Sequence, residues 1–161
     1  VAAGARCGSI VVATDAATAG SSQARIVVSA TFPYRLTLVA RRLTGDGDAA
    51  IELELQGGYF LWRDGAWSVY FDEAQFAREG WHPLPGLDSR RPHRVVIDRA
   101  IDGVAIRLDG VPLGRWPFAE AVGTGPSIVL IGRPGARARL LIRELTVTPL
   151  GPAAVVSAGT R

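Results

Sequence analysis

Two glutamates that share one face of a predicted strand are the residues best suited to acid–base chemistry. In the segment AIELELQ (50–56), Glu52 and Glu54 alternate with isoleucine and leucine, so both carboxyl groups lie opposite an apolar strand face. Glycosidases use two carboxyl groups across a cleft, one as acid and the other as base or nucleophile. We favour a solvated strand face balanced by Arg35 or Arg41, and catalysis by the glutamates is the alternative.

Other catalytic and metal-binding patterns are weak. The chain lacks a Gly-x-Ser-x-Gly nucleophile motif, and His82 and His93 have no ligand spacing, so each is expected to be a hydrogen-bonded residue. Cys7 stands alone, which excludes an intrachain disulfide and a thiolate cluster. Asp46 and Asp48 lie in a Gly-Asp-Gly-Asp run, but calcium takes six or more oxygens, so an ordinary hairpin loop is favoured. We therefore expect no metal and no cofactor.

A predicted hairpin supplies the best recognition surface. The Asp-Gly pair at 64–65 is typical of a two-residue turn, which would place Trp62 opposite Trp67 on the core side. Phe60 and Val69 would join them there. The opposite face would carry Tyr59, Arg63, Ser68 and Tyr70, with Tyr59 opposite Tyr70. Rings with polar tips beside an arginine suit sugars and protein partners, and cross-strand tyrosine packing is the alternative.

Two further segments are candidates for binding. Trp81 and His82 lie between Gly80 and Pro83, where the tryptophan either caps the core or contacts a partner. A run of arginines near the C-terminal part of the chain is a candidate anion patch for acidic glycans or phospholipid headgroups, and solvated charges are the alternative. This patch comprises Arg133, Arg137, Arg139 and Arg143, together with Arg90 and Arg91.

The elements that must position these residues are strands. The 161 residues include 19 glycines and 10 prolines, a turn-rich composition, and most segments alternate with period two. Asp-Gly pairs at 102–103 and 109–110 predict two more hairpins, the first pairing Ile101 with Val104, Ile97 with Leu108 and Asp98 with Arg107. Further strands are expected at Arg25–Ser29, Tyr34–Leu43, Val111–Trp116 (at an edge), Ser127–Ile131 and Leu140–Thr148, and a short helix at Glu73–Glu79. The pattern predicts an all-β, antiparallel two-sheet sandwich or jelly roll over 1–150, with a flexible tail at 151–161.

Charge and hydropathy bear on partners. All 18 basic residues are arginine, but 15 acidic residues are interspersed and the net charge is only +3, which argues against a nucleic-acid partner. No apolar stretch has the roughly 20 residues that a membrane-spanning helix needs, although the protein could sit on a membrane-bound assembly. The sequence begins at Val1 rather than Met, so export followed by cleavage is one hypothesis, giving an extracytoplasmic location.

Two segments carry a family resemblance. The stretch His93–Gly110, which reads HRVVID and then GVAIRLDG, resembles the central hairpin of concanavalin A-like and laminin G-like domains. The stretch RARLLIRELTVTPL (137–150) resembles their last strand, which returns to pair near the N-terminus. The resemblance implies a jelly roll that binds glycans or protein partners, and some members are glycoside hydrolases. Those hydrolases carry a Glu-x-Asp-x-x-Glu strand, which is absent here.

From these observations the sequence favours a non-catalytic recognition module or accessory subunit that docks on a protein partner in a larger assembly. A carbohydrate-binding, lectin-like module is the alternative. The remaining alternative is a carbohydrate-active hydrolase or lyase of the same fold that uses Glu52, Glu54 or Asp72.

Overall fold

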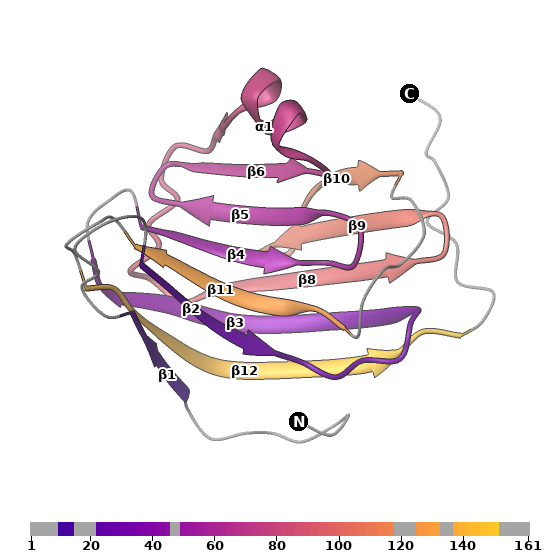
Figure 1. Cartoon of the computed structure of the whole chain (residues 1–161), viewed down its shortest axis with the longest axis horizontal. Helices are drawn as coiled ribbons and strands as arrows, with labels where there is room; N and C mark the ends of the chain where they lie inside the picture. Colours follow the sequence, from indigo (N-terminus) through magenta and orange to yellow (C-terminus); the bar gives the residue numbers. More distant parts are fainter. Residues whose placement is uncertain (1–9, 15–21, 46–48, 118–124, 133–136, 152–161) are drawn as a thin grey trace.

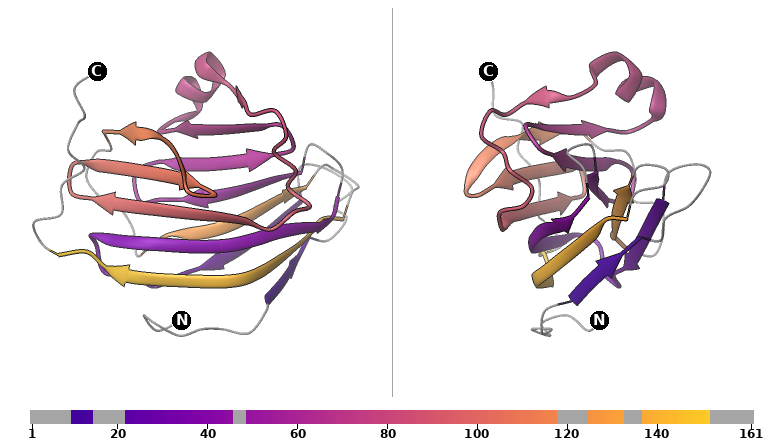
Figure 2. Two further views of the ribbon diagram at one scale, coloured as in Figure 1. Left: turned by 180° about the vertical axis from the view of Figure 1, so that it is seen from behind. Right: turned by 90° about the vertical axis from the view of Figure 1, so that its left-hand side faces the viewer.

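The fold consists of two six-stranded antiparallel sheets stacked face to face (Figure 1). The computed structural model describes residues 10–14, 22–45, 49–117, 125–132 and 137–151. This arrangement confirms the all-β sandwich predicted from the period-two pattern. The view from one side in Figure 2 shows the two layers on edge. The expected tail at 151–161 lies almost wholly outside the described residues, as do Asp46, Asp48 and Cys7.

The first sheet contains the long central strands and both resemblance segments. Its strands, in spatial order, are β1 (Ile10–Ala13), β12 (Arg139–Pro149), β3 (Tyr34–Thr44), β8 (His93–Ala100), β9 (Gly103–Leu108) and β10 (Val111–Trp116). The last strand, β12, pairs with β1, as the resemblance implied. β10 lies at the sheet edge, as its prolines predicted.

The second sheet is assembled from strands that are distant in sequence. Its spatial order is β2 (Ser22–Val27), β11 (Ser127–Gly132), β4 (Ala50–Glu54), β5 (Tyr59–Arg63), β6 (Ala66–Tyr70) and β7 (His82–Pro83). β11 thus lies between β2 and β4. Figure 1 looks onto the outer face of this sheet.

The core fills the space between the sheets. Trp62 and Phe60 are fully buried, and Val69 is nearly so, as the hairpin pattern predicted. Trp67 is only partly buried, since it lies toward the sandwich edge, where its ring meets Trp116 edge-on. The inward residues of β3, β4 and β8 supply most of the remaining apolar surface.

A short helix covers part of the outer face of the second sheet. This helix, α1 (Glu73–Glu79), begins after Asp72, whose carboxylate accepts a hydrogen bond from the Gln75 N–H, and it ends at Gly80. Its Phe76 contacts Tyr70, and Ser68 donates a hydrogen bond to the Gly80 carbonyl. Within the described part of the chain, no helix is both long and apolar enough to cross a membrane.

Of the two hairpin registers predicted from the sequence, the one at 64–65 is confirmed, and the turn predicted at 109–110 is also present. β5 and β6 pair Trp62 with Trp67 and Tyr59 with Tyr70, and β9 and β10 turn through Asp109 and Gly110, both with positive φ. The register expected for the 102–103 hairpin is wrong by two residues. Gly103 pairs with Ala100 as the first residue of β9, so the turn falls at 101–102.

The reason for this shift is packing against β10. A Cβ atom on Gly103 would lie 2.3 Å from the carbonyl oxygen of Trp116, so glycine is needed inside the strand and not in the turn. Ile97 therefore faces Ile106, and Val95 faces Leu108. An even-numbered shift keeps every side chain on its expected face.

Two buried arginines tie the sheets to their connecting loops. Arg42 donates hydrogen bonds to Ser89 and to the carboxylate of Asp64, which anchors the β5–β6 turn. Burial acts to raise the pKa of Asp64, but hydrogen bonds from Ser89 and the charge of Arg42 lower it overall. At the other end of the sandwich, Arg99 reaches the backbone carbonyls of Leu55 and Gln56.

Candidate functional site

The outer face of the second sheet is hollowed beside α1. Two adjoining hollows, of about 550 Å³ and about 600 Å³, share Arg25, Glu54, Tyr59 and Phe71 in their linings. We call the combined depression the groove. Residues of β2, β11, β4, β5 and β6 form its floor, and the chain entering α1 forms one wall. The remaining residues of its lining are Gln23, Val27, Glu52, Gln56, Gly57, Gly58, Tyr70, Asp72, Gly125, Ser127 and Ile131.

Two tyrosines stack in the groove. Tyr59 and Tyr70 are cross-strand partners, and their ring centroids lie 4.7 Å apart at an interplanar angle of 15°. The Tyr70 hydroxyl donates a 2.9 Å hydrogen bond to Glu52 and its ring is backed by Phe76. The pair therefore presents a braced aromatic surface beside a carboxylate, because contacts on two sides limit the movement of Tyr70.

The two glutamates differ in their surroundings. Glu54 forms a 2.6 Å ion pair with Arg25 of β2, whereas Glu52 is 8% exposed and receives the Tyr70 hydroxyl. The expectation that Arg35 or Arg41 balances these glutamates is wrong, because both arginines belong to β3 in the other sheet. Arg25 fills that role from β2, which is separated from β4 by the single strand β11.

Burial gives Glu52 a distinct acidity. Loss of solvent raises the pKa of Glu52, and the charge of Glu54 adds to this effect. The Tyr70 hydroxyl and the charge of Arg25 act in the opposite direction but do not cancel the rise. Glu52 thus holds its proton to a higher pH than an ordinary glutamate, so the groove contains one carboxyl group suited to proton donation and one paired with a cation.

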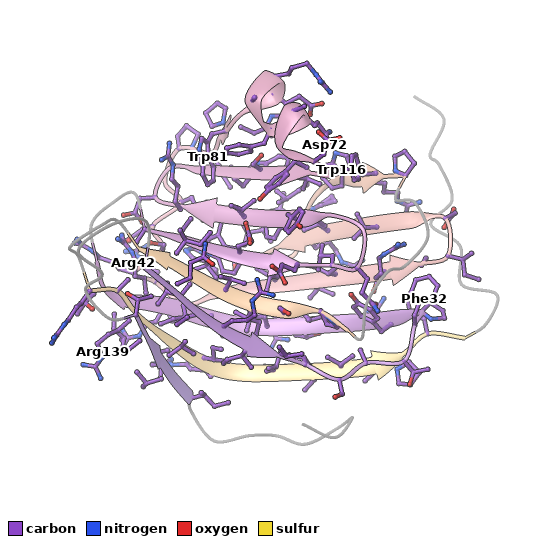
Figure 3. All side chains as sticks on the ribbon, in the orientation of Figure 1. Phe32, Arg42, Asp72, Trp81, Trp116 and Arg139 are labelled. Carbon is purple, nitrogen blue, oxygen red and sulfur yellow. The ribbon has the colours of Figure 1, made fainter. Side chains whose placement is uncertain are left out.

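The structure separates the residues that the sequence grouped for recognition. Tyr59 and Tyr70 line the groove, but Ser68 is buried beneath the end of α1 and bonded to Gly80. Arg63 lies over the Trp81 ring at 4.3 Å, outside the groove lining. Trp81 also packs edge-on against Phe76, so it covers the end of α1 (Figure 3).

Both histidines have partners in the fold. The ring of His82 contacts that of Trp67, its strand partner, in a tilted arrangement, so His82 lies on the inner side of the sheet rather than with the tyrosine pair. His93 is buried, with its ring nitrogens 2.7 Å from Asp109 and from the Asp88 carbonyl. This confirms that His93 is a hydrogen-bonded residue of the core. In the described ranges, no three His, Cys, Asp or Glu side chains are grouped as a metal site would require.

Several groove residues were missed at the sequence level. Arg25, Gln23 and Ile131 reach the groove only because β11 pairs with β4 and β2 pairs with β11. Their alternation placed them on a strand face, but no local signal identified the partner strand. Phe71 was missed as well, because it lies between β6 and α1 rather than inside an alternating segment.

The candidate anion patch lies on the other sheet. Arg139 and Arg143 are exposed on β12, and Arg137 is exposed just before it. Arg133 lies outside the described residues. Arg91 is 4.0 Å from Asp88, whereas Arg90 and the three described patch arginines have no ion pair in the described structure.

The architecture defines a class of protein: a concanavalin A-like jelly roll with a hollowed outer sheet face. No family model matches the sequence, and no curated protein matches it. Among solved structures, 89% of the chain superposes on 15% of a sialidase chain, with a TM-score of 0.62 and 10% identity. An endo-β-1,3-glucanase from Pyrococcus furiosus gives a TM-score of 0.55 at 16% identity, over 86% of this chain and 74% of the glucanase.

A lectin has a similar fold. The galectin LEC-6 from Caenorhabditis elegans gives a TM-score of 0.52 at 14% identity, over 77% of this chain and 89% of the galectin. The chain spans only about a seventh of the sialidase but most of the galectin and the glucanase. At these identities the similarity establishes the jelly-roll fold.

These comparisons correct the expectation that the protein is not an enzyme. The same fold is found in the glucanase from Pyrococcus furiosus and in a putative β-glucanase from Mycobacterium abscessus. The missing Glu-x-Asp-x-x-Glu strand therefore does not exclude catalysis, because the fold also brings Glu52, Glu54 and Asp72 together from β4 and the chain entering α1.

Proposed function

We propose that the protein binds carbohydrate in the groove on the outer face of the second sheet. The observation that carries this proposal is the stacked pair of Tyr59 and Tyr70 in the same hollow as Glu52, Glu54 and Arg25. A sugar ring offers an apolar C–H face to an aromatic ring and hydroxyl groups to carboxylates and guanidinium groups. The groove provides all three kinds of contact.

The shape of the groove supports a chain of sugars over a single small molecule. The two hollows adjoin through four shared residues, so the depression continues from the Gly57–Gly58 turn to the start of α1. Two adjoining hollows of this size accommodate an oligosaccharide with neighbouring units in each hollow. The similarity in fold to a galectin and a glucanase agrees with a carbohydrate ligand.

The binding test uses substitutions at Tyr59. We expect an array of neutral and acidic oligosaccharides to identify a ligand, and Tyr59→Ala to weaken its binding about tenfold in calorimetry, because the stacking ring is lost. Tyr59→Phe keeps the ring and should retain most of the affinity. Ile101→Ala, at an exposed position in the β8–β9 turn, is the control and should bind normally.

Other outcomes separate the competing functions. A blank array together with a co-purified protein would reject carbohydrate binding and support the protein-interaction role predicted from the sequence. Equal loss of binding in Tyr59→Ala and Ile101→Ala would show that the groove is not the site.

Cleavage of the bound glycan is a second candidate, favoured by the raised pKa of Glu52. In this scheme Glu52 donates a proton to the glycosidic oxygen as the bond to the anomeric carbon breaks. Glu54 either takes a proton from a water that attacks this carbon, or bonds to the carbon itself in a glycosyl-enzyme that water then hydrolyses. Reducing ends released from the bound glycan, and their loss in both Glu52→Gln and Glu54→Gln, would establish catalysis. A glycan that binds but stays intact would identify a lectin-like module.

An extracytoplasmic location, periplasmic or secreted, accompanies the proposal. The support is the carbohydrate ligand itself, since long polysaccharides are found chiefly outside the cytoplasm. Fractionation of the native cells followed by immunodetection tests it, and recovery only in the cytoplasm would reject it.

A further inference from the structure

The outer face of the first sheet divides into a neutralised zone and a cationic zone. In the middle of the sheet, Arg35 and Arg107 both pair with Asp98, and Arg94 pairs with Glu144. These arginines are therefore matched by carboxylates on adjacent strands. This zone carries little excess charge.

The cationic zone lies at the end of the sheet where β1 is paired. Arg41 of β3 faces Leu141 of β12 in the strand register, and Arg139 and Arg143 lie two residues before and after Leu141 on β12, each at a register shift between the two strands. None of the three arginines forms an ion pair in the described part of the chain, and the Nε atom of Arg41 is buried without a hydrogen-bond partner.

Two more arginines extend this zone. Arg137 is exposed immediately before β12. Arg90 is exposed in the segment before β8, which continues beside the end of β3 because the Arg42 N–H donates to the Ser89 carbonyl at 2.7 Å. Arg42 and Arg139 lie at the same end of the sandwich in Figure 3. We call Arg41, Arg90, Arg137, Arg139 and Arg143 the cationic cluster.

In the described ranges, no carboxylate forms an ion pair with an arginine of the cluster. The nearest carboxylate along β12 is that of Glu144, and it is already paired with Arg94. Like charges held within one Debye length repel, and an external anion relieves that repulsion. A single small anion is satisfied by one or two guanidinium groups, whereas five groups spread over three neighbouring chain segments match a ligand with several charges.

We propose that the cationic cluster binds a linear acidic polysaccharide through its sulfate or carboxylate groups. Arg41, Arg139 and Arg143 lie on two neighbouring strands, which in a sheet are about 4.8 Å apart, and Arg90 and Arg137 extend the cluster beyond them, which suits a polymer with repeated charges. A membrane-binding surface needs large apolar side chains that insert among lipids. Of the exposed large apolar residues in the described ranges, Val11 alone lies on β1, β3 or β12, so the polysaccharide is favoured.

The proposal is independent of carbohydrate binding in the groove, because the cluster and the groove lie on opposite sheets. The left-hand view in Figure 2 shows the sheet that carries the cluster from the outside. A chain that lost groove binding through Tyr59→Ala would retain binding at the cluster. Binding in the groove and binding at the cluster can therefore be disproved independently of each other.

The test measures binding of fluorescein-labelled heparin, dextran sulfate and polygalacturonate, with neutral dextran as the uncharged probe. The cluster variant is Arg41→Gln, Arg139→Gln and Arg143→Gln combined. The control is Arg35→Gln, Arg94→Gln and Arg107→Gln, which removes the same charge from the neutralised zone of the same sheet. We expect the cluster variant to lose more than tenfold in affinity and the control to lose less than threefold. In the cluster variant, the slope of the logarithm of the binding constant against the logarithm of the salt concentration should become shallower by about two to three.

Several results would overturn the proposal. These are equal loss in both triple variants, binding to neutral dextran with equal affinity, and an absence of polyanion binding. Capture on phosphatidylserine vesicles without polysaccharide binding would assign the cluster to a membrane, and tighter binding of single-stranded DNA would assign it to nucleic acid. Should the triple variant melt early, the exposed pair Arg139→Glu and Arg143→Glu replaces it and must abolish binding.

Discussion

At the scale of single residues, Glu52 shows how burial changes the chemistry of a side chain. It sits on the outer strand face with Glu54, yet Glu52 is buried and accepts a hydrogen bond from Tyr70, while Glu54 reaches Arg25. The raised pKa of Glu52 means that the folded state binds its proton more tightly than the unfolded chain does. Ionised Glu52 therefore lowers the stability of the folded state.

The first prediction concerns stability against pH. Because the folded pKa is raised, the destabilisation is absent below the ordinary glutamate value, grows as pH rises through the raised value, and is complete above it. Glu52→Gln cannot ionise and keeps an acceptor for the Tyr70 hydroxyl. We expect its melting temperature to exceed that of the unsubstituted protein at pH 7 and to match it at pH 4.

Thermal melts monitored by circular dichroism at both pH values check this expectation. Glu54→Gln is the matched control and should not show the same gain, since it removes an ion pair with Arg25. A lower melting temperature for Glu52→Gln at pH 7 would contradict the assignment of burial as the dominant effect.

At the scale of elements, buried arginines connect strands to turns that strand pairing alone does not fix. The Arg99 guanidinium lies inside the sandwich and donates to carbonyls of the β4–β5 turn, of Ala100 and of Gly103. Gln56 in that turn has a positive φ, and the adjacent Gly57 and Gly58 line the groove. Arg99 is therefore a positioning residue for one end of the groove.

The second prediction follows from these hydrogen bonds. Arg99→Met keeps much of the side-chain volume but leaves several buried carbonyls without their donor, at about 1–3 kcal/mol each. We expect a loss of at least about 3 kcal/mol in the free energy of unfolding, measured with urea. The control is Arg35→Met, at an exposed arginine of the first sheet, and Arg99→Met should weaken glycan binding in the groove more than this control does. Equal stability of the two variants would contradict the role of Arg99.

At the scale of the whole molecule, stability depends on apolar contact between the two sheets. Trp62 is fully buried and stacks with Phe60, while residues of β3 and β8 approach from the other sheet. Trp81, by contrast, is half-buried outside the sandwich over Arg63. The two tryptophans therefore differ in what they hold together.

The third prediction compares these tryptophans. Trp62→Ala leaves a cavity between the sheets and should lower the free energy of unfolding by about 3–5 kcal/mol. Trp81→Ala should lower it by clearly less, because its ring covers only α1 and one arginine. Chemical denaturation of both variants measures the difference, and equal losses would show that the space between the sheets is not the principal core.

The amino-acid sequence by itself predicted the helix at Glu73–Glu79, the alternation of faces and every strand of the two sheets except β1 and β7, although β2 begins at Ser22 rather than at Arg25. It did so because period-two alternation and Asp-Gly turns are local signals, read within about ten residues. Tyr59 and Tyr70 were placed together for the same reason, since a tight turn sets their register.

Only the tertiary structure decided which strands are neighbours. Placing β11 between β2 and β4 brought Arg25 to Glu54, and the return of α1 buried Ser68 while leaving Tyr70 in the groove. Contact with β10 likewise moved the β8–β9 turn by fixing Gly103 inside a strand. Alternation identifies which face of a strand is buried, but it does not identify the neighbouring strand. Pairing between distant segments depends on the packing of the entire sandwich.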